Sequence, residues 1–324
     1  MSEFSIIDRI RQLCSASGDD VLVGPGDDTA VLSTDRLKGG HLLMTVDTMV
    51  EKAHFVRDSL TPRQIGRKCI AAAVSDIAAM GGKPLWALVS CGFDGSQWPE
   101  DKIVELARGM KERLDDLGAG LVGGNLARSD VFFVSVTVAG LCSGRPMKRS
   151  GAVEGDLIAV TGSLGGARIG RRLLEKERKA DHPTVKRYID PPARIQEGLG
   201  LGKIAHACID ISDGLLIDLG HLLRASGAGA VLEADRIPLP DCSGLDPELD
   251  EDVFLAALSG GEDYELLAAI PPDGAPKLKT ISSDTGTPIS VIGKITSNPD
   301  EIIMIDAEGN EIPLPHDVGW DHFK

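Results

Sequence analysis

The chain has 324 residues, and its 34 Lys and Arg against 49 Asp and Glu give a formal net charge of −15 at pH 7. Proteins that grip a nucleic acid backbone do so through clustered Lys and Arg, so this charge balance excludes nucleic acid as an expected partner. The longest uncharged apolar stretch, residues 131–142, is shorter than the ~20 residues that span a bilayer, so we also expect no membrane association.

The first half of the chain alternates helix-like and strand-like segments. Apolar periodicity predicts a helix over residues 4–15, and an apolar run predicts a strand over residues 41–46 that leads into Asp47. Thr61 and Pro62 are a cap and a first-turn proline, so a second helix should begin there and end near Met80. The pattern then predicts a strand over residues 85–93, a helix over 99–117 and a strand over 131–141.

A segment rich in glycine and charge, residues 145–156, separates this half from the next. Beyond it the pattern predicts strands over 157–161, 230–233 and 264–270, a strand pair near residues 291 and 302, and helices after residue 166 and over 193–206 and 215–225. The alternation indicates an α/β or α+β fold, and the length favours two domains. We place them at residues 1–148 and 149–324.

Cysteine usage and the first residues bear on the compartment. The 6 cysteines are far apart, without a CxxC pair or a Cys/His cluster at zinc spacing, which is typical of a reducing environment. Glu3 and Asp8 stand where a signal peptide would be apolar. We therefore expect a cytoplasmic protein.

Acidic residues interrupt apolar segments at several places. Asp76 lies within a helical run of Ala, Val and Ile, where burying an unpaired carboxylate would cost several kcal/mol. The acids in such apolar or glycine-rich segments are Asp27, Asp28, Asp47, Asp76, Asp210, Asp213, Asp218, Glu262 and Asp263. Asp213 alone could be a helix cap, and Asp27 with Asp28 an Asx turn, but their number favours a role in binding cations.

The chemistry of these side chains indicates which cation they would bind. Carboxylate oxygens without Cys/His clusters, together with several Gly-Gly pairs, favour Mg²⁺ held against phosphate groups. Glycine allows backbone N–H groups to approach phosphate oxygens closely. The chain contains no GxxxxGK[ST] loop and no HRD or DFG motif, so a nucleotide site would be of another kind.

Seven motifs in the same order make the chain similar to one known family. They are Gly-Pro-Gly-Asp-Asp at 24–28, Val-Asp-Thr-Met-Val-Glu-Lys-Ala-His-Phe at 46–55, Ser-Asp-Ile-Ala-Ala-Met-Gly-Gly-Lys-Pro at 75–84, Arg-Ser-Gly-Ala-Val-Glu-Gly-Asp at 149–156, Asp-Ile-Ser-Asp-Gly-Leu at 210–215, Ser-Gly-Gly-Glu-Asp-Tyr-Glu-Leu at 259–266 and Trp-Asp-His-Phe at 320–323. The chain resembles the thiamine-monophosphate kinases over its whole length. These enzymes belong to the ATP-dependent superfamily of aminoimidazole-ribonucleotide synthetase and selenophosphate synthetase.

The resemblance implies a two-domain α/β fold, a homodimer formed through the N-terminal β-sheet, and transfer of the γ-phosphoryl group of ATP to thiamine monophosphate. By matching motif it implies Mg²⁺ ligands at Asp28, Thr45, Asp47, Asp76, Asn125, Asp210 and Asp213. It likewise implies ATP contacts at Gly124, Asn125, Arg149 and Ser212, and substrate contacts at His54, Glu262 and Trp320. Trp320 would offer a ring face to the cationic thiazolium, or else simply pack its domain.

The chemistry of this reaction agrees with the residues present. A phosphate monoester acceptor has a second pKa of ~6 and needs no general base, and the sequence shows no plausible nucleophile–base pair. Two positions depart from the family pattern: Asn125 replaces a usual Asp, and Val46 replaces a common Thr. The alternatives are another ATP-dependent enzyme of the superfamily, or a nucleotide-binding protein whose catalysis is impaired at Asn125.

Overall fold

A computed structural model describes residues 9–10, 12–13, 21–23, 31–32, 35, 38–55, 59–176, 181–243, 252–299 and 301–315. The chain forms two compact units. The N-terminal unit comprises Met1–Ile77 and Gly82–Ser143, and the C-terminal unit comprises Ala78–Gly81 and Gly144–Lys324. Most of the helix expected over residues 4–15 lies outside the described residues.

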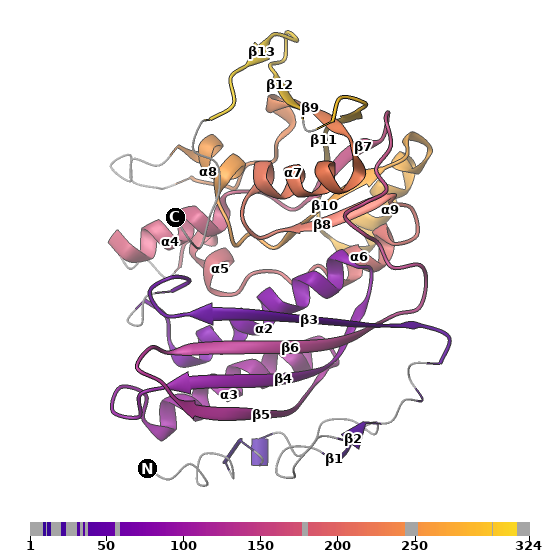
Figure 1. Ribbon diagram of the computed structural model, residues 1–324. Coiled ribbons are helices and arrows are strands. Elements are labelled where there is room, and N and C mark those ends of the chain that lie inside the picture. Colours follow the sequence, from indigo (N-terminus) through magenta and orange to yellow (C-terminus); the bar gives the residue numbers. More distant parts are fainter. Residues whose placement is uncertain are drawn as a thin grey trace. The chain divides into compact units, whose positions relative to one another are not determined.

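A four-stranded sheet with the order β3-β6-β4-β5 forms the centre of the N-terminal unit (Figure 1). Its strands are β3 (His41–Val50), β4 (Lys83–Phe93), β5 (Gly120–Arg128) and β6 (Phe133–Cys142), and a separate pair is formed by β1 (Val21–Val23) and β2 (Val31–Leu32). The β4–β5 pair is parallel, whereas β6 runs antiparallel to β3 and to β4. The strand β5 has no counterpart among the elements expected from the sequence.

Two helices of this unit, α2 (Pro62–Ala79) and α3 (Glu100–Asp116), pack closely on each other. The predicted start of α2 is confirmed, because the Thr61 N–H donates to Gln64 Oε1 while the Gln64 N–H donates to Thr61 Oγ1. A Cβ atom on Gly66 would lie 2.1 Å from the Leu106 carbonyl oxygen, so glycine is needed where α2 meets α3. The opposite face of the sheet exposes large apolar side chains, Leu42, Met44, Val46 and Leu88.

The C-terminal unit contains a seven-stranded sheet with the order β13-β12-β9-β11-β7-β10-β8. The strands are β7 (Leu157–Thr161), β8 (Ala207–Ile211), β9 (Gly229–Glu233), β10 (Glu265–Ile270), β11 (Ile289–Thr296), β12 (Ile302–Ile305) and β13 (Glu311–Ile312). Its helices are α4 (Gly166–Lys176), α5 (Pro183–Ile189), α6 (Ile195–Leu201), α7 (Leu215–Ser226), α8 (Val253–Ser259) and α9 (Ala275–Thr285), with short 3₁₀ turns at Ala234–Arg236 and Pro272–Gly274. The expected strands are confirmed, but β11 and β12 each pair with β9 rather than with each other, and the helix expected over 193–206 is shorter.

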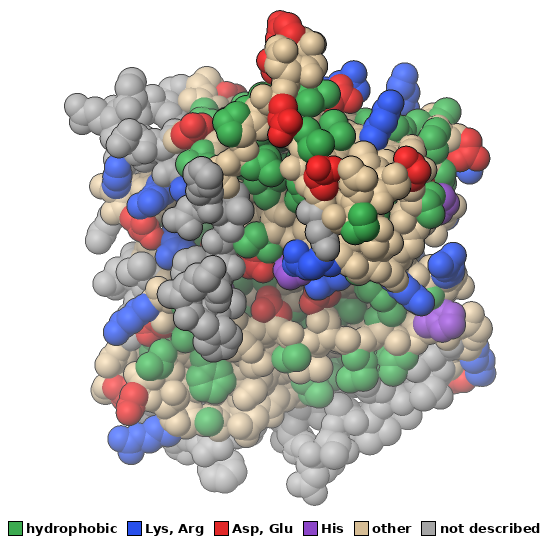
Figure 2. Space-filling view, turned by 45° about the horizontal axis from the view of Figure 1, so that its top comes forward, with side chains coloured by type: hydrophobic (Ala, Val, Ile, Leu, Met, Phe, Trp, Pro, Cys, Tyr) green, Lys and Arg blue, Asp and Glu red, His purple; other side chains and the backbone are tan. Residues whose placement is uncertain are grey.

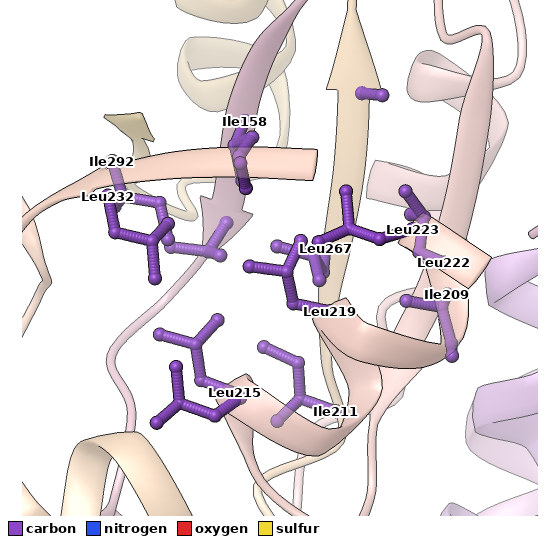
Figure 3. Close-up of a cluster of buried hydrophobic side chains, with 14 of the residues drawn as sticks. Ile158, Ile209, Ile211, Leu215, Leu219, Leu222, Leu223, Leu232, Leu267 and Ile292 are labelled. Atoms are coloured by element: carbon purple, nitrogen blue, oxygen red, sulfur yellow. The ribbon is translucent and has the colours of Figure 1, made fainter. Parts of the chain in front are cut away.

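The core of the C-terminal unit lies between α7 and the sheet (Figure 3). Leu215, Leu219, Leu222 and Leu223 recur at helical spacing and form the apolar side of α7. They pack toward Ile209 and Ile211 of β8 and Leu267 of β10. Burial of each such side chain contributes about 1.5–3 kcal/mol, so α7 is firmly held and can position residues at both of its ends.

Among the helices in the described part of the chain, none is long and apolar enough to cross a membrane.

Candidate functional site

In the N-terminal unit, β3 and α2 bring oxygen ligands together. Thr45 and Asp47 alternate with outward residues of β3 and share the face of the buried Leu43 and Met49. The Thr45 Oγ1 hydroxyl donates to Asp76 Oδ2 at 2.5 Å, which shows that this face looks toward α2. The Asp47 carboxylate accepts the N–H of Thr48 at 2.7 Å.

This group has the composition that Mg²⁺ requires, namely two carboxylates and a hydroxyl without nitrogen or sulfur ligands. Asp76 is only half-buried, so its charge remains accessible to an ion. Among the described residues, no three Asp, Glu, His or Cys side chains converge as a metal site. Asp28, the further ligand that the sequence implies, lies outside the described residues.

His54 follows β3 in a turn whose backbone is tightly fixed. The N–H of Lys52, a residue with a φ of 74°, donates to the Phe55 carbonyl at 2.8 Å, and the Phe55 ring is fully buried. His54 Nδ1 lies 3.1 Å from the Val50 backbone nitrogen and accepts its N–H. A neutral His54 ring with this bond carries its proton on Nε2, which makes Nε2 a hydrogen-bond donor.

The register of the sheet separates Asn125 from this group. Asn125 on β5 pairs with Ser90 on β4, which pairs with Ser135 on β6. Ser135 in turn lies opposite Thr48, and their hydroxyls are 2.9 Å apart. Since Thr48 and Asp47 point to opposite faces of β3, Asn125 lies on the sheet face away from Asp47.

Gly124 has a structural reason to be glycine. A Cβ atom at this position would lie 2.1 Å from the Val89 carbonyl oxygen, which no side chain could tolerate. Gly124 is also exposed on the edge strand β5, so its backbone is accessible to a ligand.

In the C-terminal unit, the turn of residues 212–214 joins β8 to α7 and carries Ser212 and Asp213. Asp218, in the first turn of α7, accepts the N–H groups of Ser212, Asp213 and Gly214 at 3.0, 3.0 and 3.1 Å. Burial raises the pKa of Asp218 to about 7, and these amide bonds oppose the rise. Asp218 Oδ2 therefore holds the backbone of the turn, which gives this buried carboxylate a structural role.

Asp210, which precedes this turn at the end of β8, is buried beside β10. Ser212 and Asp213 are half-buried. The carboxylates of Asp210 and Asp213 thus bracket a turn whose backbone conformation Asp218 fixes. Carboxylates held in this way fit the oxygen coordination of Mg²⁺.

Glu262 lies in a second turn that is bonded directly to the first. The Glu262 N–H donates to the Ser212 carbonyl at 2.8 Å, and the Tyr264 N–H donates to the Ile211 carbonyl at 2.9 Å. Glu262 and Tyr264 have φ values of 68° and 51°, in the left-handed region that costs a non-glycine residue about 1–3 kcal/mol. Such strain persists where surrounding contacts enforce it, and it is concentrated at binding sites.

Side chains next to Glu262 supply these contacts. Asp263 accepts the N–H groups of Gly165 and Ala167 at 2.5 and 2.9 Å and so caps α4, and burial raises its pKa to about 7. Glu265 is fully buried and forms a bidentate pair with Arg194 at 2.6 and 2.7 Å. Asp263, like Asp218, is therefore a structural acid rather than one that awaits a cation.

Sequence reasoning missed the Glu265 network, because its partners lie far away in the chain. Thr161 Oγ1 donates to Glu265 at 2.6 Å, and Arg187 approaches the same carboxylate at 3.1 Å. The only sign of this network in the sequence is Glu265, a charged residue within the apolar run of β10, since a buried charge needs a partner of opposite charge.

Arg149 lies in the loop that joins β6 to β7 and is exposed. The N–H of Cys208 donates to the carbonyl of the preceding residue, Lys148, at 2.8 Å, which ties this part of the loop to β8. Trp320, the other expected substrate contact, lies outside the described residues.

Comparisons with known proteins identify the family. The family models described as AIR synthase related protein, N-terminal domain, and AIR synthase related protein, C-terminal domain, match residues 26–142 and 153–306. The thiamine-monophosphate kinase of Salmonella typhimurium is 33% identical over 327 residues, which cover 99% of this chain and 98% of that protein. The chain belongs to the thiamine-monophosphate kinase family. The family member from Methanospirillum hungatei is 35% identical, with 97% of each chain covered.

Solved structures of thiamine-monophosphate kinases share the fold. The enzyme from Stenotrophomonas maltophilia K279a superposes with a TM-score of 0.82 at 32% identity, covering 93% of this chain and 96% of that one. AaThiL, solved in complex with AMPPCP and TMP, has a TM-score of 0.77 at 30% identity, covering 99% of this chain and 97% of that one. These matches confirm the family and the α/β fold class predicted from the sequence.

Proposed function

We propose that this chain transfers the γ-phosphoryl group of ATP to thiamine monophosphate and forms thiamine diphosphate. The observation that carries the proposal is the relationship to AaThiL, which extends over 99% of this chain and whose solved complex contains AMPPCP and TMP. Full-length identity of 33% to a thiamine-monophosphate kinase supports the same reaction.

Mg²⁺ fits the oxygen groups of both units. In the proposal, Asp28, Thr45, Asp47 and Asp76 hold ions from the N-terminal unit, and Asp210 with Asp213 from the C-terminal unit. When bound, Mg²⁺ supplies charge neutralisation at the phosphate oxygens, which is the main requirement of phosphoryl transfer. Asn125 lies across the sheet from Asp76, so we assign it to ATP rather than to the Asp76 metal group.

The remaining residues bind and orient the two substrates. Arg149 offers a guanidinium to the ATP phosphates, and Gly124 and Ser212 contact ATP. His54 donates a hydrogen bond from Nε2 to thiamine monophosphate, and Glu262 accepts a hydrogen bond from it. The Trp320 ring covers the cationic thiazolium. The acceptor phosphate is ionised near neutral pH because its second pKa is ~6, so the transfer is in-line and direct, without a general base or a phosphoenzyme.

We further propose that the enzyme is a homodimer formed by the N-terminal sheet. Met44 and Val46 are 67% and 62% exposed, and they lie near the exposed Leu42 and Leu88 on the face opposite α2. Figure 2 shows hydrophobic side chains, in green, on the visible surface of this unit. Contiguous apolar surface of this kind marks an interaction site, and a second copy of the sheet would cover it.

The position of Asn125 favours this function over the alternative of a nucleotide-binding protein with impaired catalysis. That alternative requires the missing carboxylate to disable the metal group. Since Asn125 pairs with Ser90 on the face away from Asp47, the oxygen atoms of Thr45, Asp47 and Asp76 do not depend on it, which supports an active metal group.

The test is incubation of the purified chain with ATP, thiamine monophosphate and a Mg²⁺ series, with thiamine diphosphate measured by chromatography. We expect product that rises with Mg²⁺ and disappears with excess chelator. Binding of ATP without product at saturating Mg²⁺ would instead support the impaired protein. A superfamily synthetase would form no thiamine diphosphate but would consume ATP with a different acceptor.

A further inference from the structure

Ser226, the last residue of α7, holds the loop that carries Arg149. Its Oγ accepts the N–H groups of Gly151 and Ala152, each at 3.2 Å, and donates to the Arg149 carbonyl at 3.1 Å. A serine hydroxyl has one donor and two acceptor sites, so these three contacts use its whole capacity. One side chain therefore fixes the backbone on both sides of residue 150.

The backbone next to this contact is fixed as well, while the Arg149 side chain is exposed to solvent. Lys148 is bonded through its carbonyl to Cys208 of β8. Gly151 has a φ of 120°, and a Cβ atom there would lie 2.8 Å from the His206 carbonyl oxygen. The backbone thus has little freedom around Arg149, although the residue itself is exposed.

The electrostatic surroundings place Arg149 and the turn of residues 212–214 beside the same helix. His221 of α7 accepts a hydrogen bond from Arg224 Nη2 at 2.9 Å. Burial, then Arg224, then Arg149 lower the pKa of His221, while Asp213 opposes this effect. His221, in the middle of α7, therefore lies within electrostatic range of both Arg149 and Asp213.

We propose that Ser226 is a positioning residue for ATP, which keeps Arg149 where its guanidinium meets the phosphate groups. The inference rests on the proposed function, in which Arg149 binds ATP. It adds that the C-terminal end of α7 holds the Arg149 loop, while Asp218 near the other end holds Ser212 and Asp213. The same buried helix would thus align both groups that face the nucleotide.

Removing the Ser226 hydroxyl releases the loop without emptying the core. The N–H of Gly151 is exposed and can be hydrated, whereas Ala152 is buried, so the variant should fold but lose some stability. Misplacement of a binding group by about 1 Å can reduce a rate up to 100-fold. We therefore expect Ser226→Ala to raise the KM for ATP about tenfold, which is about 1.4 kcal/mol.

The experiment compares KM values for both substrates in Ser226→Ala and Ser226→Thr. Ser226→Ala should raise the KM for ATP and leave the KM for thiamine monophosphate within twofold, and Ser226→Thr should restore most of the ATP affinity because it keeps the hydroxyl. The matched control is Ser129→Ala, since Ser129 Oγ likewise bonds the N–H and carbonyl of one residue, Val131, in a turn of the N-terminal unit. This control should leave both KM values unchanged.

A double-mutant cycle with Arg149→Ala shows whether Ser226 acts through Arg149. The effect of Ser226→Ala on the KM for ATP should disappear in the Arg149→Ala background. An equal effect in both backgrounds, or no effect in either, would overturn the proposal. Should Ser226→Ala fail to fold, Ser226→Cys provides a side chain of similar size with weak hydrogen bonding.

The wild-type assay separates this inference from the function on which it rests. A wild-type chain that makes no thiamine diphosphate contradicts the proposed function. A wild-type chain that is active, with a Ser226→Ala variant of unchanged KM for ATP, contradicts only the role of Ser226.

Discussion

Replacement of Asp76 by Asn separates the charge of this residue from its packing. Asn occupies nearly the same volume and keeps one oxygen that can accept the Thr45 hydroxyl. The bond present in the wild type, at 2.5 Å, joins that hydroxyl to a carboxylate, and bonds to charged groups contribute about 1.5–3 kcal/mol against about 1 kcal/mol for neutral ones. The free energy of unfolding should therefore fall by only about 1 kcal/mol, which lowers Tm by a few degrees.

Catalysis should suffer much more, because the charge serves the ion. Loss of one electrostatic contact to the reacting groups commonly costs a factor of about 100 to 1,000 in rate, or about 3–4 kcal/mol. We expect Asp76→Asn to lose at least about 100-fold in kcat/KM and to need more Mg²⁺ for its half-maximal rate.

The assay measures Tm and a Mg²⁺ titration of the rate on the same preparation. Asp116→Asn is the matched control, since Asp116 of α3 also forms one contact, with Arg67 at 3.1 Å, but lies at the surface. Its rate and Mg²⁺ requirement should equal those of the wild type. An Asp76→Asn variant that turns over at the wild-type rate, or whose whole defect follows from unfolding, would refute a metal-binding role.

Three further predictions concern other parts of the chain. Burial raises the pKa of Asp263 from 3.8 to about 7, so the folded state binds more protons than the unfolded state in this range. The resulting contribution to stability is present below pH ~4 and lost as the pH rises toward 7. The free energy of urea unfolding should therefore depend less on pH in Asp263→Asn, and an unchanged pH profile would contradict the assignment. If the proposed dimer forms through this sheet, Val46→Glu should give monomers in sedimentation experiments, whereas Leu239→Glu, at an exposed apolar residue of the C-terminal unit, should not; a dimeric Val46→Glu chain would exclude this face. Asn125→Asp should leave the Mg²⁺ requirement of the rate unchanged, since Asn125 lies across the sheet from Asp47, and a lowered requirement would show that Asn125 is a ligand after all.

The fold class could be predicted from the sequence because most elements carry local signals. Thr61 and Pro62 predict the start of α2, and the helical spacing of leucines over residues 215–223 predicts α7. The strand β5 was missed because Gly123 and Gly124 dilute its apolar pattern, and pairing with β4 rather than propensity stabilises it. The helix expected over 193–206 ends early at Gly202, beyond which the chain turns into β8.

The candidate site could be predicted in part, since the motifs supplied its residues but not their partners. Nothing local distinguishes Asp213, which is half-buried in a turn, from Asp218, which holds the backbone of that turn. Asp263 bonds amides about a hundred residues away, at Gly165 and Ala167. Partners this distant in sequence become visible only when the chain is folded.

Direct transfer of the γ-phosphoryl group between two phosphate compounds can be followed with ATP labelled in its γ-phosphate, Mg²⁺ and thiamine monophosphate. We expect the label in the terminal phosphate of thiamine diphosphate, one equivalent for each ATP consumed, with none retained on the protein. Label released only as inorganic phosphate, or trapped covalently on the chain, would contradict direct transfer.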